Sequence, residues 1–144
     1  MSIANKALVH RWFEEVWNRK REGAIRELLH PEALLYGLGE PPSPVVRGPD
    51  EFLPFWKKFV SAFPNMTITV ESVLAEDDMI AMRCHVRGRH TNKGLGLEAT
   101  NAQIAFNGMG MARIKDGQII EAWNNFDFLA LYQQIGVVKL NTGS

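Results

Sequence analysis

One carboxylate lies inside the most apolar and aromatic stretch of the sequence, residues 119–136, which read IIEAWNNFDFLALYQQIG. An acid among apolar neighbours loses hydration, so it points to water, binds a partner or takes part in proton transfer. Trp123, Asn125 and Asp127 alternate along a predicted strand, and side chains two residues apart share a face. We therefore expect Asp127 to face a pocket beside an indole and a neutral amide. Desolvation there suits a carboxyl group for general acid–base catalysis.

A structural role explains the same acid. Asp127 comes at the end of the predicted strand and directly before a short helix predicted over 129–135. A carboxylate in that place can accept backbone N–H bonds and cap the helix. From the pattern alone, the catalytic and the capping role both remain open.

The other chemically competent side chains are scattered. His90, in RGRHTN, could reach the mouth of a pocket or order the connection that follows it. Arg83, His85 and Arg87 share a polar strand face, which is typical of a solvated or intersubunit surface. An Arg-His-Asp network of the epoxide-hydrolase kind is the alternative there. Cys84 lies on the apolar face of its strand without a basic partner, so a nucleophile is not expected.

The balance of charge narrows the classes of partner. Sixteen basic residues equal sixteen acidic ones among 144 residues, which gives no electrostatic reason to expect nucleic acid or an anionic membrane. No segment approaches the roughly 20 apolar residues that span a bilayer, and the first residues lack the apolar core of a signal peptide. No histidine pair with a carboxylate has metal-ligand spacing, so we expect no metal. The sequence predicts one cytoplasmic domain over 1–144, with a frayed tail at 136–144.

Three helices are predicted before the strands. Apolar residues recur at helical spacing over 3–18 and 21–29. A third helix begins at Pro49 and ends at Phe63, and its aromatic residues recur every three or four positions. A short strand is expected over 33–38 and a proline-rich loop over 39–50.

The second half of the chain reads as strands, over 66–75, 79–90, 101–115 and 118–128. Asp116-Gly117 separates the last two and is a strong hairpin signal. Helices first and strands afterwards predict an α+β fold: a strongly bent, mostly antiparallel sheet wrapped around three N-terminal helices, with an internal pocket. We expect Trp12, Phe59 and Phe63 to be buried. The residues expected to line the pocket, besides those on the last strand, are Tyr36, Trp56 and Phe59.

Four segments carry a family resemblance. They read NKALVHRWFEEVWN, RGPDEFLPFWKKFVSAFPN, IAMRCHVRGRHTN and RIKDGQIIEAWNNFDFLALYQQIG. Together they resemble the SnoaL-like polyketide cyclases of the nuclear transport factor two-like superfamily, whose fold is a cone. The resemblance covers roughly residues 5–136. Its most specific part is a C-terminal string carried by Asp116, Gly117, Ile119, Glu121, Trp123, Asp127, Gln134 and Gly136.

The resemblance implies a chemistry. Enzymes of this family close a ring by intramolecular aldol condensation without metal or organic cofactor, and Asp127 matches their acid–base aspartate. Their partner histidine has no counterpart on the preceding strand, where Arg113 is the nearest match; an arginine could hold an enolate but not act as a base. His90 matches a family histidine and completes the predicted catalytic set.

The expected function is therefore a cofactor-free enzyme that transfers protons on a small, apolar, polyketide-like carbonyl compound, by aldol condensation or isomerisation. The alternatives are a non-catalytic binding module of the same fold and an epoxide-hydrolase-like enzyme. Proteins of this family commonly dimerise through the sheet, so the resemblance also implies a homodimer. We expect it to form on the sheet face that bears Arg83, His85 and Arg87.

Overall fold

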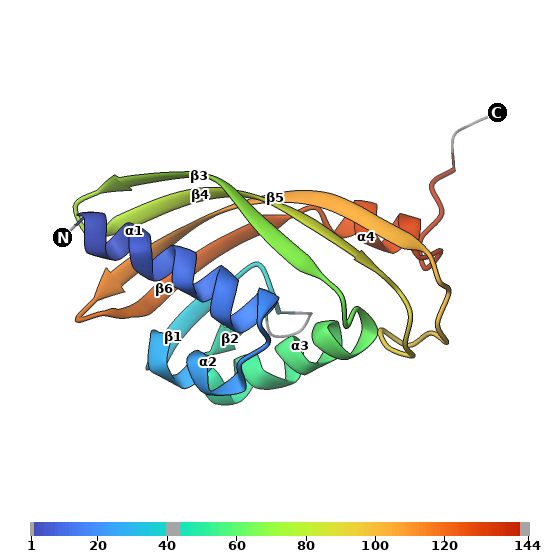
Figure 1. The fold of residues 1–144 in the computed structure, drawn as a ribbon, viewed down its shortest axis with the longest axis horizontal. Coiled ribbons are helices and arrows are strands. Elements are labelled where there is room, and N and C mark those ends of the chain that lie inside the picture. The colour runs from blue at the N-terminus through green and yellow to red at the C-terminus, as the bar shows by residue number, and fades with distance from the viewer. Residues whose placement is uncertain (1, 40–43, 142–144) are drawn as a thin grey trace.

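The computed structural model describes residues 2–39 and 44–141, which form one mixed sheet with helices on its concave side (Figure 1). The strand order is β2-β1-β6-β5-β4-β3. The strands are β1 (Leu29–Tyr36), β2 (Val45–Arg47), β3 (Thr67–Glu76), β4 (Met79–Arg89), β5 (Gln103–Lys115) and β6 (Gln118–Phe126). Strands β3 to β6 form an antiparallel meander, and β1 joins β6 in parallel.

The helices are α1 (Ser2–Arg11), the π-helix η1 (Trp12–Asn18), α2 (Glu22–Leu28), α3 (Gly48–Ala62) and α4 (Phe128–Gln134). The first helix was expected as one regular helix over 3–18, but its second half is a π-helix. Within the described ranges, no helix is long and apolar enough to cross a membrane.

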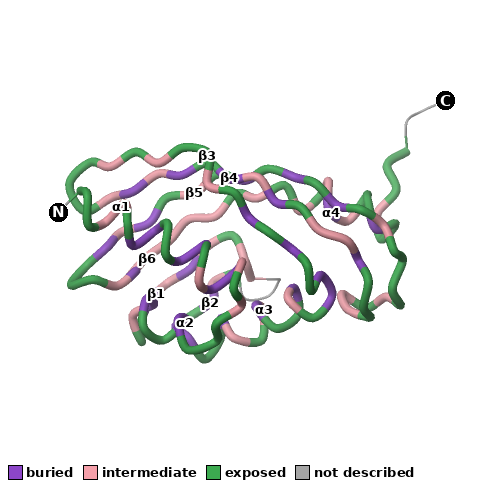
Figure 2. The backbone as a smooth tube through the Cα atoms, viewed as in Figure 1, coloured by how far each residue is buried: buried purple, intermediate pink, exposed green. Residues whose placement is uncertain are grey.

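Alternating side chains place the core between the sheet and the helices. On β4, Ile80, Met82, Cys84 and Val86 are buried, whereas the residues between them lie on the outer face. Figure 2 shows these buried and less buried positions alternating along the strands. Burial raises the pKa of the Cys84 thiol to about 12, with a smaller contribution from the Glu71 carboxylate. The thiol is therefore protonated at neutral pH.

The predicted architecture is confirmed. Trp12, Phe59 and Phe63 are only 8%, 5% and 0% exposed. Strand β4 pairs with β5 along its whole length, and β5 turns into β6 at Asp116-Gly117 with positive φ at both residues, as a tight hairpin requires.

One strand was missed. Val45–Arg47 pair with Leu34–Tyr36 inside the segment predicted as a loop over 39–50, of which residues 40–43 lie outside the described part. Three residues beside prolines are too short for a period of two to be recognised.

Candidate functional site

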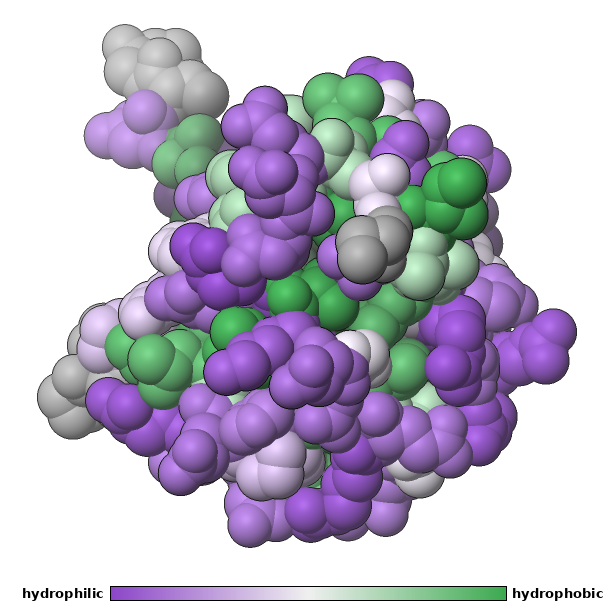
Figure 3. Space-filling model, turned by 90° about the vertical axis from the view of Figure 1, so that its left-hand side faces the viewer, coloured by the Kyte–Doolittle hydropathy of each residue, from purple (hydrophilic) through white to green (hydrophobic). Residues whose placement is uncertain are grey.

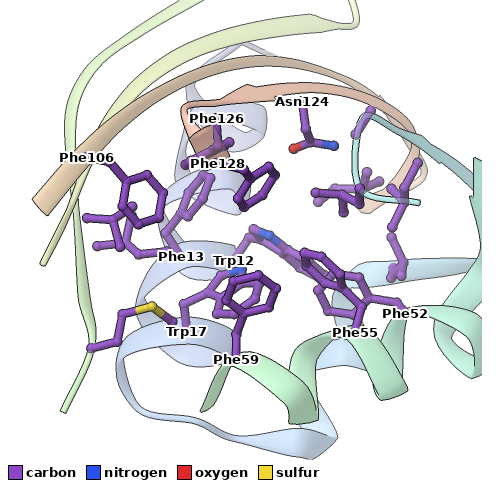
Figure 4. A pocket seen from close by; sticks show the side chains of 18 residues that line it. Trp12, Phe13, Trp17, Phe52, Phe55, Phe59, Phe106, Asn124, Phe126 and Phe128 are labelled. Atoms are coloured by element: carbon purple, nitrogen blue, oxygen red, sulfur yellow. The ribbon is translucent and has the colours of Figure 1, made fainter. Parts of the chain in front are cut away.

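A cavity of about 80 Å³ lies between the concave side of the sheet and the helices η1 and α3. Its lining side chains come from every layer of the fold (Figure 4). They are Trp12, Phe13, Trp17, Leu29, Leu35, Leu38, Phe52, Phe55, Phe59, Met66, Ile68, Val86, Phe106, Ile119, Ala122, Asn124, Phe126 and Phe128. At the end of the molecule where α1 begins, Figure 3 shows hydrophobic side chains gathered in a recess between hydrophilic ones.

Aromatic rings form most of the cavity wall. Phe52 from α3 contacts both indoles of η1, with ring centroids 5.2 Å from Trp12 and 6.0 Å from Trp17. Phe59 continues this wall and contacts Phe128, which follows β6, at 5.9 Å. Such a wall favours a ligand that is apolar and contains rings.

Asn124 is the single amide or ionisable side chain among the described residues that line the cavity. Its Nδ2 donates a hydrogen bond of 3.0 Å to the carbonyl of Tyr36, which fixes the orientation of the amide. The second N–H and Oδ1 make no hydrogen bond to the described part of the protein and can bind one oxygen-bearing group of a ligand. Figure 4 shows the amide reaching from the sheet toward the aromatic side chains.

The face of β6 that borders the cavity is not the predicted one. Ala122, Asn124 and Phe126 line the cavity, so Trp123 and Asn125 lie on the outer face of the sheet. The reason is a register shift against β5 just after Ile119, which also lines the cavity although it is three residues from Ala122. A bulge changes which alternate residues face inward. The expectation that Trp123 and Asn125 would line the pocket is therefore wrong.

Asp127 adopts the capping geometry. Its Oδ1 accepts a hydrogen bond of 3.0 Å from the backbone N–H of Ala130, and its own N–H donates to the carbonyl of Asn107 at 2.9 Å. The carboxylate is exposed and does not line the cavity. The expected placement inside the pocket is wrong, and the capping alternative is the one observed.

Asp127 instead borders a shallow groove on the outer face of the sheet. Glu71, Arg83, Asn107 and Asn125 line the same groove, and all of them are exposed. His85 lies beside it, with Nδ1 2.7 Å from Oδ1 of Asn107. The groove thus gathers the residues considered for an Arg-His-Asp network, but on a solvated surface rather than in a dry site.

His90 is fully buried outside the cavity lining. Its Nδ1 lies 2.9 Å from Oγ1 of Thr100 and accepts the Thr100 backbone N–H at 3.3 Å. Its backbone bonds to Asn101 and Ala102 as well. This geometry ties the connection between β4 and β5 together, and the side chain does not reach the cavity.

Arg113 lies at the far end of the sheet and is not near the cavity lining. Its guanidinium binds Asp78 at 3.1 Å and Glu121 at 3.3 Å, and the hydrogen bond to Asp78 is the main reason why the pKa of Arg113 is raised. The expectation that this residue would hold an enolate in the pocket is wrong, because Arg113 does not line the cavity and its guanidinium is engaged by Glu121 on β6 and by Asp78 in the β3–β4 turn.

Of the three predicted wall residues outside β6, only Phe59 lines the cavity. Trp56 is buried behind the wall, where its Nε1 donates to the carbonyl of Val16 at 2.8 Å. Tyr36 lies on the outer face and stacks on Trp123 with centroids 5.9 Å apart. Both were assigned to the wall wrongly: on β1 it is Leu35 that faces inward instead of Tyr36, and Trp56 on α3 lies outside the lining.

Sequence reasoning did not place Asn124 or the aromatic residues Trp12, Phe13 and Trp17 in the cavity wall. The three aromatic residues could have been recognised as wall residues, because aromatic side chains concentrate on both helices that face the sheet. Within residues 2–39 and 44–141, no three His, Cys, Asp or Glu side chains are grouped to hold a metal ion.

The sequence profile of the SnoaL-like polyketide cyclases matches residues 7–135. Aklanonic acid methyl ester cyclase DnrD of Streptomyces peucetius is 28% identical over 125 residues, which cover 85% of this chain and 84% of that protein.

Solved structures agree in fold. IdmH of Streptomyces antibioticus, provisionally assigned as a polyketide cyclase, superposes with a TM-score of 0.79 at 29% identity, covering 92% of this chain and 98% of IdmH. A SnoaL-like protein of Jannaschia sp. CCS1 gives a TM-score of 0.82 at 22% identity, over 96% and 95% of the two chains. AclR of Streptomyces galilaeus, provisionally assigned as a hydroxylase, gives 0.81 at 23% identity, over 96% of this chain and the whole of AclR.

Proposed function

Since this chain belongs to the SnoaL-like polyketide cyclase family, we propose that it binds a small, largely apolar carbonyl compound in its cone cavity, with Asn124 holding the ligand's oxygen. One observation carries the proposal: a wall of aromatic and aliphatic side chains presents one oriented amide. A wall of this composition binds the apolar body of a ligand, and the amide orients the ligand by binding its oxygen-bearing end.

The size of the cavity limits the ligand. A volume of about 80 Å³ is below the ~150 Å³ cavity that accommodates benzene in a designed apolar site. Even a single ring must therefore displace side chains. Phe55, Phe126 and Phe128 are the half-buried rings among the wall aromatics, so we expect these to move first. A flexible, polyketide-like chain could enter only by such an adjustment.

The described residues that line the cavity include no acid or base that could transfer a proton. An aldol closure needs a base to remove a proton beside a carbonyl and an acid to protonate the new alkoxide. Asn124 can polarise a carbonyl but cannot accept a proton at neutral pH. The geometry therefore supports binding and orientation of the ligand, the non-catalytic alternative, more directly than catalysis by Asp127.

The Asn124→Leu variant tests this function. It keeps the branching of the side chain but removes the amide, so the preference for acetophenone over the matched hydrocarbon ethylbenzene should fall about fivefold, the equivalent of one neutral hydrogen bond of ~1 kcal/mol. The ratio of the two affinities is the measure, because the larger leucine side chain affects both compounds alike. Ligand-observed NMR titration measures both affinities; an unchanged ratio, or no binding of either compound by the wild type, contradicts the proposal.

A cyclase-type enzyme is the second candidate, and the similarity to DnrD favours it. In that case the wild type would consume aklanonic acid methyl ester, the substrate class in the name of that relative. Asp127 would then have to receive the proton from the outer side of β6, and His90 and Arg113 would act from outside the cavity.

Replacing Asp127 by asparagine tests whether this carboxylate takes part in any turnover. Asparagine caps a helix almost as well as aspartate, so we expect the unfolding free energy to change by only a few tenths of a kcal/mol, against about 1 kcal/mol for Asp127→Ala. Any turnover should persist, because the carboxylate faces solvent. Thermal melts beside an assay of ester consumption check this; turnover by the wild type would establish the enzyme, and its loss in a folded Asp127→Asn protein would show that Asp127 takes part in it.

A further inference from the structure

The helix that carries the two indoles of the cavity is wound more widely than an α-helix. In η1, Trp12–Asn18, the backbone bond from Arg19 N to Glu14 O (2.8 Å) reaches back five residues. The bond from Arg21 N to Glu15 O (2.9 Å) reaches back six. Such π-helical segments are rare and concentrate at functional sites.

The wide turn decides which side chains reach the cavity. In an α-helix, residues five apart point about 140° away from each other, since each residue turns by about 100°. Trp12 and Trp17 are five apart, yet both line the cavity and both contact Phe52. The hydrogen bonds that span five residues bring these two positions back over each other.

The apolar pattern does not distinguish the two windings. The buried residues Val9, Trp12, Phe13, Val16 and Trp17 recur at i, i+3, i+4, i+7 and i+8, which is the spacing of an amphipathic α-helix. The π-helical winding is therefore set by contacts from elsewhere in the fold.

Two tertiary contacts hold η1, a part-buried one at Asn18 and a buried one at Val16. Asn18 uses its whole amide: Nδ2 donates to Ile68 O at 2.9 Å and to Glu14 Oε2 at 3.0 Å, and Oδ1 accepts the Ile68 N–H at 2.6 Å. From α3, Trp56 Nε1 donates to the carbonyl of Val16. The ion pairs on the outer side, such as Arg19–Glu14, are exposed and contribute little.

We propose that Asn18 is a positioning residue for the cavity: by pairing with both backbone groups of Ile68 it holds η1 in the π register and so keeps Trp12 and Trp17 on one wall. Without this clamp, residues 12–18 relax toward an α-helix and Trp17 turns off the wall. The ligand-binding consequence rests on the proposed function of the cavity, whereas the effect on helix register does not.

The test uses the full chain labelled with 5-fluorotryptophan, whose four resonances are assigned with single Trp→Phe variants. In Asn18→Ala, the ¹⁹F signals of Trp12 and Trp17 should shift, while that of Trp123 on the outer face should stay. Acetophenone affinity should fall about tenfold, as expected when one indole leaves the wall. Trp56→Phe removes the second contact and should move the same two signals, which keeps the test valid if Asn18→Ala does not fold.

Asn65→Ala is the matched control. Asn65 also ties its side chain to a distant backbone group, accepting the Arg89 N–H at 3.1 Å, but it lies outside η1. It should lower stability without moving the Trp12 and Trp17 signals. Unshifted signals in both folded clamp variants would overturn the proposal. If the signals shift but the wild type does not bind acetophenone, the role of Asn18 in holding the helix register is supported and the proposed ligand of the cavity is contradicted.

Discussion

Replacing Gly37 by alanine should destabilise the protein by at least about 2 kcal/mol and abolish binding in the cavity. Gly37 has φ +87°, and a Cβ added there would lie 2.0 Å from the backbone oxygen of Asn124. The main chain fixes the position of the Cβ and the oxygen is itself a main-chain atom, so no side-chain rotation can relieve the clash. β1 must separate from β6 just where Tyr36 holds the amide of Asn124. Urea unfolding and an acetophenone titration measure the two effects.

Gly117→Ala separates the clash from the backbone strain. Gly117 also has a positive φ, +75°, but a Cβ there would meet no atom within 4 Å. Its replacement by alanine should lower the free energy of unfolding by about 1–2 kcal/mol, because only glycine adopts the left-handed conformation without strain. Binding should be unchanged. Equal losses of stability and of binding in the two variants would show that the close approach of Gly37 to β6 is unimportant.

Periodicity was sufficient to predict the layers of the fold. A period of two over β4 and β5, the Asp116-Gly117 turn and the aromatic stripe of α3 each specify a local structure whose buried face is unambiguous. Burial of the apolar face drives these elements together, so local pattern and tertiary packing agree. For that reason the α+β architecture followed from the sequence.

The face of β6 could not be predicted in the same way. A strict period of two from Glu121 groups Trp123 with Asp127, and that grouping is correct. The sequence does not say which of the two groups faces inward, because the register shift after Ile119 breaks the continuity of the strand pattern. Trp123 also finds an aromatic partner outside, in Tyr36. Because of this bulge, the amide of Asn124 faces the cavity, whereas the carboxylate of Asp127 had been expected there.

The π-helix was hidden for a related reason. The buried apolar residues of this segment have the spacing of an amphipathic α-helix, so the pattern is read as one. The winding is set instead by contacts from residues far along the chain, Trp56 and Ile68. Cavity geometry therefore depends on pairings about 40 to 50 residues apart, which no local pattern contains.

The outer face of the sheet should pair two copies of the chain. A row of side chains crosses four neighbouring strands in register, Leu74, Ala81, Met111 and Trp123, and ends on Tyr36. Leu74 and Met111 in this row are 71% and 45% exposed, and Met109 beside it is 58% exposed. Such a connected apolar surface is uncommon on monomers. Flanking groups of both signs, Arg83 and the carboxylates of its groove, can pair across a two-fold axis.

Sedimentation at micromolar concentration should therefore give a species of roughly 33 kDa, twice the 16.3 kDa of one chain. Met111→Glu should weaken the dimer by roughly a hundredfold or more, because it buries an unpaired charge and, across a two-fold axis, can bring two such charges together. Ile3→Glu is the control, since Ile3 is 85% exposed on α1 in the helical layer. It adds the same charge away from the sheet and should leave the dimer intact. A wild-type protein that sediments only at the mass of one chain would show that this row of side chains is not an interface between copies.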